Sequence, residues 1–144
     1  MANYNWGRIV TKKITVGGVG VAGCDFNFVT AANQNEQPIN LLAAIPGNSR
    51  ILDVFTLTNT AFTGAVSLGV KIGTASAGTQ IAASADVIAA NAINQTAVGA
   101  GFTWVVISAS AATIWLSATP GANWSNATAG KLTCYITYQD LTGL

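Results

Sequence analysis

The chain has 144 residues, enough for one domain with a buried core. Charged side chains make up 8% of it, against about 25% in an average soluble domain, and the net charge is +1. This balance excludes a strongly basic nucleic-acid-binding surface, and the 51% apolar content excludes a disordered chain. A surface with so little charge favours association with other protein subunits.

The first seven residues, MANYNWG, are predicted to form an N-terminal arm that docks on a partner, because two aromatic side chains, Tyr4 and Trp6, stand among polar ones. The segment lacks the apolar stretch of a signal peptide. No later apolar run approaches the roughly 20 residues of a membrane-spanning helix. We therefore expect synthesis in a cytosol, no contact with a membrane, and a single domain over residues 8–144.

The first strand pattern, RIVTKKITV at residues 8–16, leads into a glycine-rich run, GVGVAG at residues 18–23. The glycine spacing matches G-x-G-x-x-G, which in dinucleotide-binding proteins opens a helix whose N-terminus faces the phosphates. Here an alternating strand pattern, CDFNFVT at residues 24–30, follows instead. The acid expected about twenty residues after the motif is also missing, because Glu36 comes too early and Asp53 too late. We therefore interpret the run as a connection between two strands that needs glycine's conformational freedom.

Alternation of apolar and polar residues continues along most of the chain and indicates strands with one buried face. SADVIAANA at residues 84–92 departs from it and is interpreted as a short helix capped by Ser84. Strands are expected at residues 8–16, 24–30, 37–44, 50–59, 66–72, 102–108, 113–119 and 131–138. Turns are expected at Pro46-Gly47, Thr63-Gly64, Pro120-Gly121 and Ala129-Gly130. The pattern predicts an all-β fold, a β-sandwich or jelly roll of about eight strands with at most one short helix.

The side chains that enzymes use most are scarce. Histidine is absent, which removes the commonest general base and the commonest metal ligand. The five carboxylates are isolated in sequence, and no nucleophile, phosphate-binding or metal-binding motif is found. Asp53 falls beside Ile51 and Phe55 on the apolar side of its strand, and we expect it to form a salt bridge or a hydrogen bond, with Arg50 as the candidate partner. The sequence thus predicts no enzyme, no cofactor and no metal site.

The two cysteines, Cys24 and Cys134, lie too far apart for a zinc site, and no histidine is present to complete one. Both fall on the inward side of expected strands, where cysteine behaves as a small apolar residue. They either pair across neighbouring strands or stay free, and synthesis in a cytosol favours free thiols.

Two strand patterns are apolar beyond one face. FTWVVIS at residues 102–108 carries apolar side chains on both sides, and TIWLSAT at residues 113–119 turns a tryptophan outward. The extra face either lies under a loop or the short helix, or forms a subunit interface, where aromatic anchors are enriched. We take four residues as candidates for contacts between copies: Trp104, Val105, Ile107 and Trp115.

A further aromatic residue, Trp124, lies in the loop PGANWSNATAG. We favour a role in covering the open end of the core, because indole side chains are large and mostly buried. The alternative is a loop contact to a sugar or to a neighbouring subunit.

Three segments, LLAAIPGNSRILDVFTLTNTAFTGAVSLGVKIGT, AASADVIAA and SATPGANWSNATAGKLTCYITY, resemble a loose group of small virion proteins of tailed bacteriophages. The resemblance spans roughly residues 37–138 and is carried by pattern: a strand that begins near IPGNSRI, Thr-rich strands after it, and a Gly-Ala-Asn loop before TAG and the last strand. It implies a β-sandwich or jelly roll with a structural place in the virion, as a capsid decoration (cement) protein, head fibre or tail component. It implies no catalytic residues.

Together with the absent chemistry, the resemblance implies a capsid decoration protein made in the bacterial host cytoplasm. A homotrimer on the outside of a phage head would bridge subunits of the major capsid protein, and Tyr4 and Trp6 would contact the capsid. One alternative is a tail-tip or fibre module that recognises a host glycan through Trp115 or Trp124. Another is a head–tail adaptor or tail-tube component.

Overall fold

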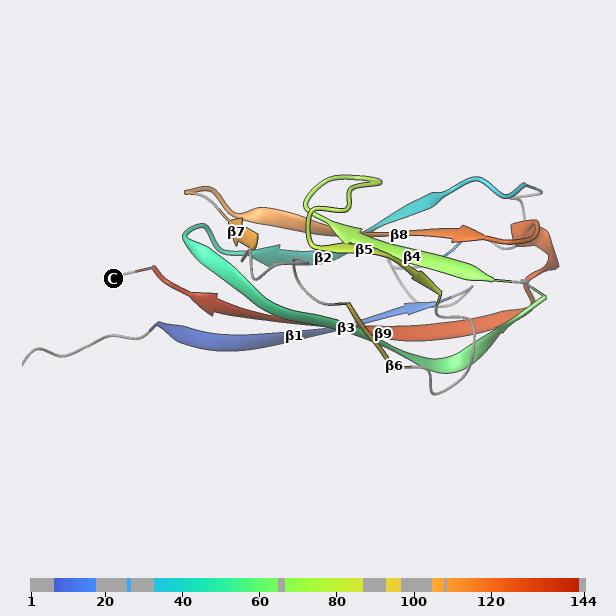
Figure 1. Ribbon diagram of the computed structural model, residues 1–144, viewed down its shortest axis with the longest axis horizontal. Helices are drawn as coiled ribbons and strands as arrows, with labels where there is room; N and C mark the ends of the chain where they lie inside the picture. Colours follow the sequence, from blue (N-terminus) through green and yellow to red (C-terminus); the bar gives the residue numbers. More distant parts are fainter. Residues whose placement is uncertain are drawn as a thin grey trace, which may run out of the picture.

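The computed structural model describes residues 7–17, 26, 33–64, 67–86, 93–96, 105–107 and 109–142. Within these residues the chain forms nine strands and one short 3-10 helix. The strands make two antiparallel sheets that pack face to face, as the two layers in Figure 1 show. The expectation of an all-β sandwich is confirmed.

The first sheet runs in the order β1-β9-β3-β6, with β7 also paired to β3. The second sheet runs in the order β2-β8-β4-β5. The strands of the first sheet are β1 (Arg8–Gly17), β9 (Ala129–Asp140), β3 (Ser49–Thr63), β6 (Ile93–Thr96) and β7 (Val105–Ile107). Those of the second are β2 (Gln37–Ile45), β8 (Ala112–Pro120), β4 (Leu68–Gly73) and β5 (Ala82–Asp86).

This strand order is that of a jelly roll. β9 occupies one edge of β3 along its length, while β6 pairs with Val54–Leu57 and β7 with Ser49–Ile51. The two short strands therefore share one position on the other edge of β3, which leaves four strand positions in each sheet. The chain passes repeatedly from one sheet to the other, as two interleaved Greek keys require.

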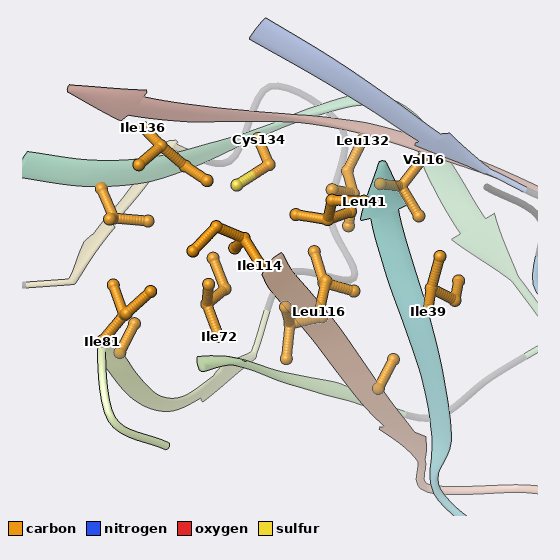
Figure 2. Close-up of a cluster of buried hydrophobic side chains, with 14 of the residues drawn as sticks. Val16, Ile39, Leu41, Ile72, Ile81, Ile114, Leu116, Leu132, Cys134 and Ile136 are labelled. Atoms are coloured by element: carbon orange, nitrogen blue, oxygen red, sulfur yellow. The ribbon is translucent and has the colours of Figure 1, made fainter. Parts of the chain in front are cut away.

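The core lies between the sheets, because alternate residues of each strand point inward. Figure 2 shows side chains of β9 facing those of β8, β2 and β4 across this space. The largest fully buried side chains outside the aromatic group are Val16, Leu41, Ile45, Ile51, Leu68, Ile72, Ile114, Leu116, Leu132 and Ile136. Val10 and Ile14 of β1 pack against the margin of this cluster.

β3 contains a bulge that the alternating pattern did not predict. Its pairing with β9 shifts between Ile51 and Asp53, so one extra residue reverses the faces beyond that point. Val54 and Thr56 turn inward and are buried, while Phe55 lies on the outer face and is half-buried. The placement of Asp53 and Phe55 on the apolar side with Ile51 was therefore wrong.

Two local expectations also fail. Residues 84–86 of the expected helix instead belong to β5, which pairs with β4. The Asp86 carboxylate accepts a hydrogen bond from the Leu68 backbone N–H at 3.1 Å. Residues 87–92 lie outside the described part of the chain. The turn expected at Ala129-Gly130 is the start of β9. A Cβ on Gly130 would overlap the ring of Phe62, so this glycine gives the ring room to pack.

Candidate functional site

Several residues that the sequence singled out lie outside the described part of the chain: Tyr4, Trp6, Cys24 and Trp104. For Val105 the structure places the backbone, which pairs with Ile51 on the edge of β3. Ile107 is 3% exposed and belongs to the core, so its side chain offers little surface to another copy. Contacts between copies through Trp104 and Val105 stay predictions.

Trp124 closes one end of the sandwich. It lies in the 3-10 helix Trp124–Asn126 and is 1% exposed. Its ring stacks on Phe26 with 5.1 Å between centroids, and its indole N–H donates to the Asn35 carbonyl oxygen at 2.7 Å. Phe26 in turn meets Phe62 edge to face at 6.1 Å. The structure therefore matches the covering role, and a sugar or a neighbouring subunit cannot reach the ring without opening this end.

Trp115 lies on the outer face of the second sheet and is half-buried. It stands in a cross-strand row between Asn40 of β2 and Gly73 of β4. The loop after β4 packs beside this row, because the Ala77 backbone N–H donates to the Ser117 hydroxyl at 3.1 Å. Trp115 is thus partly exposed and flanked by an amide side chain, as a contact residue requires.

The outer face of the first sheet carries a second aromatic feature. Phe55 of β3 and Tyr135 of β9 lie directly opposite each other and stack with 4.4 Å between centroids. Lys13 of β1 continues the row, with its Nζ 5.9 Å from the Tyr135 ring centroid. Next to it the hydroxyls of Thr11 and Thr137 are 2.9 Å apart. Sequence reasoning missed this surface because the bulge that turns Phe55 outward is invisible in the pattern.

The open edge of the sandwich between β1 and β2 forms a groove of about 500 Å³. Val10, Lys12 and Ile14 of β1 line one wall, and Leu41 and Ala43 of β2 line the other. Thr11, Lys12 and Lys13 add polar groups to the lining, and Lys12 lies opposite the buried Ile136 and so on the inward side of β1. Lys12 was not singled out from the sequence. A lysine at an inward position becomes meaningful only when β1 is known to lie at the edge of its sheet, beside the groove.

The carboxylates of the described residues have structural partners. Glu36 forms an ion pair with Lys71 at 3.0 Å, and Asp86 receives the Leu68 N–H. Asp140 accepts hydrogen bonds from the Thr142 hydroxyl at 2.5 Å and backbone N–H at 2.9 Å. Both hydrogen bonds lower the pKa of Asp140, and the bond from the Thr142 hydroxyl has the larger effect. No three potential metal ligands cluster within the described residues.

Arg50 and Cys134 also have defined surroundings. The Arg50 Nε donates to the Gln139 side-chain oxygen at 2.6 Å across the β3–β9 pair. Cys134 carries a free thiol in the core, and burial raises its pKa to about 12. The Cys134 thiol is therefore neutral and shielded, and it packs as an apolar residue.

No helix in the described part of the chain is long and apolar enough to cross a membrane.

Comparison with known proteins is informative at the level of fold. No protein-family model and no curated protein matches the chain. Among solved structures, a chain of the capsid asymmetric unit of cyanophage Pam1 superposes with a TM-score of 0.57 over 96% of this chain and 89% of that one, at 16% identity. The two chains share a fold.

A second similar chain comes from the acid-stable capsid structure of the Helicobacter pylori bacteriophage KHP30, with a TM-score of 0.46, 12% identity and coverage of 92% and 91%. The fold shared with the Pam1 chain confirms the fold that the sequence resemblance to phage virion proteins implies.

Proposed function

We propose that this protein is a non-enzymatic structural component of a phage head, and that it decorates the outside of the shell. The observation that carries the proposal is the jelly roll shared with a chain of the Pam1 capsid over 96% of the length. Jelly rolls recur in viral capsids, where many copies of one small rigid domain are tiled by symmetry. The host cytoplasm would be the place of synthesis and the virion the final location.

A structural role agrees with the chemistry of the described residues. Glu36 and Asp86 each hold neighbouring strands or loops in place, and Asp140 caps its own turn. The residues that line the groove between β1 and β2 include two lysines, Lys12 and Lys13, and no carboxylate. A general acid and base near a common substrate position, which most hydrolytic and transfer reactions need, are not found in this part of the chain.

The mechanism we propose is mechanical. Each copy would bridge neighbouring subunits of the major capsid protein and bury apolar area worth about 25 cal/mol per Å². The contribution of one copy is modest, but symmetry repeats it over the whole shell and so opposes the outward pressure of packaged DNA. The stacked Phe55 and Tyr135 lie on the outer face of the first sheet, where their rings offer apolar area for such a contact.

Two contacts complete the proposal. Tyr4 and Trp6 of the N-terminal arm would bind the capsid, and Trp104, Val105 and Trp115 would join the copies of a homotrimer. Deleting residues 1–7 should then reduce binding to heads while the jelly roll still folds. The control is a variant in which Asn3 and Asn5 are replaced and both aromatic residues are kept, which should bind as the intact chain does.

Co-sedimentation of the purified protein with empty expanded phage heads tests the proposal. We expect saturation at a fixed ratio to the major capsid protein, and a solution mass of three times the 14.7 kDa chain. Heads that assemble only when this chain is present would make it a shell subunit and contradict decoration. Recovery in tail fractions alone would favour a head–tail adaptor or tail-tube component.

A second function, recognition of a host glycan by a tail-tip or fibre module, is favoured by one observation. Trp115 is partly exposed beside Asn40 on the outer face of the second sheet, and aromatic faces with nearby amide groups bind sugars. Binding to host cells that Trp115→Ala abolishes while binding to heads persists would support it. Trp124, being buried, takes no part in this alternative.

A further inference from the structure

β1 is an edge strand with one side unoccupied in the described structure. It pairs with β9 from Arg8 to Gly17 and ends the strand order of the first sheet. Alternate backbone N–H and C=O groups of such an edge point away from the sheet and are free to pair with an added strand. Ile9 on this strand is 64% exposed, more than any other large apolar side chain in the described residues.

The groove between β1 and β2 lies directly beside this edge. Its walls supply Val10 and Ile14 on one side and Leu41 and Ala43 on the other. Leu41 and Ala43 sit in a bulge of β2, where pairing with β8 shifts between Asn40 and Ala44. A strand added to β1 would place every second side chain over this opening, because side chains alternate between the two faces of a sheet.

Charge decides what kind of strand fits. Arg8, Lys12 and Lys13 are three of the six basic residues of the whole chain, and all three lie on β1. Lys12 stands at the groove and Lys13 on the outer face, and neither has a carboxylate within ion-pair distance in the described residues. Pairing β1 with β1 of a second copy would oppose like charges, which is unfavourable. An inward-facing lysine also deters indiscriminate edge pairing.

We propose that the β1 edge is a docking site for an extended acidic segment of a different protein, which adds to the first sheet as one more strand. Apolar side chains of that segment would enter the groove between β1 and β2, and its carboxylates, which alternate with them, would lie on the outer face and pair with Lys13. The proposal depends on the geometry of this edge and holds whether or not the protein decorates a phage head.

The experiment uses the full chain and two end-blocked peptides of about the length of β1, which has 10 residues. In the first peptide valine alternates with glutamate and threonine; in the second, lysine replaces glutamate. Fluorescence anisotropy measures the affinity of each labelled peptide, and hydrogen–deuterium exchange locates the protected backbone. We expect the acidic peptide to bind and to protect residues 8–17, and the basic peptide to bind at least about tenfold more weakly.

Two matched variants connect the binding to the charges. Lys13→Gln should weaken the acidic peptide up to about five-fold, the effect of one exposed ion pair. Lys131→Gln changes a lysine of β9 that lies outside the groove and should leave the affinity unchanged. Unfolding curves of both variants check that they fold as the parent chain does.

Four results would overturn the proposal. The first is a dissociation constant weaker than about 1 mM, a free energy too small for specific docking. The second is equal binding of the two peptides. The third is protection confined to other strands. The fourth is protection of β1 that rises with protein concentration in the absence of peptide, which would make a second copy the occupant.

Discussion

Replacing Trp124 tests whether this residue closes the core or serves as a surface contact. Trp124→Ala removes a side chain that is 1% exposed, and truncation of a buried aromatic residue to alanine costs about 3–5 kcal/mol of unfolding free energy. The stacking on Phe26 supplies about 1 kcal/mol of this, and the hydrogen bond to the Asn35 carbonyl oxygen about 1 kcal/mol. Trp124→Phe keeps the stack and loses the hydrogen bond, so we expect a cost of about 1–2 kcal/mol.

The assay is urea unfolding followed by far-ultraviolet circular dichroism, at one protein concentration because association would shift the midpoint. Trp115→Phe is the matched control: this half-buried tryptophan lies on an outer face, and the change should cost less than about 1 kcal/mol. A cost below about 1 kcal/mol for Trp124→Ala, together with loss of partner binding, would refute the core role and make Trp124 a contact residue.

Three further predictions concern a buried thiol, a glycine and an exposed carboxylate. Because the Cys134 pKa is raised from 9.0 to about 12, the unfolded chain loses this proton first as the pH rises. The free energy of unfolding should therefore fall by up to about 1.4 kcal/mol per pH unit between these values. In urea titrations, Cys134→Val should lack this fall. An equal dependence of the unfolding free energy on pH in the variant would contradict the prediction. Gly64→Ala should lower the unfolding free energy by about 2 kcal/mol or more in thermal unfolding, since φ is +83° and a Cβ would overlap the Asn126 carbonyl oxygen; unchanged stability would refute this backbone assignment. Thr142→Val should raise the lowered pKa of Asp140 towards its ordinary value in an NMR titration, while Thr142→Ser keeps it low. The hydrogen-bonded carboxylate favours folding above its ordinary pKa and loses that contribution as the pH falls through the lowered value, so identical titration of both variants would contradict the assignment.

The strands with one buried face were predictable from the sequence, because their alternation reports directly which side chains leave water. In β9 the residues Leu132, Cys134, Ile136 and Tyr138 are all buried, as their spacing indicates. The turns at Gly47, Gly64 and Gly121 follow from residues that favour tight bends. The all-β sandwich was therefore within reach of pattern and turn chemistry alone.

Features that depend on pairing partners were not predictable. The bulge at Leu52–Asp53 changes the face of Phe55, and it exists because β3 must stay in register with β9. β6 and β5 have short patterns that become strands only when β3 and β4 provide edges for them. The groove beside Lys12 likewise requires knowing that β1 and β2 both lie at sheet edges. Local sequence carries no record of these distant neighbours.

Electron cryomicroscopy of phage heads saturated with the protein, compared with bare heads, tests directly whether the protein decorates the shell. We expect added density on the outside of the shell, at fixed symmetry positions, into which the two-sheet jelly roll of Figure 1 fits. Density of this shape within the shell layer itself, or only in the tail, would contradict decoration of the head.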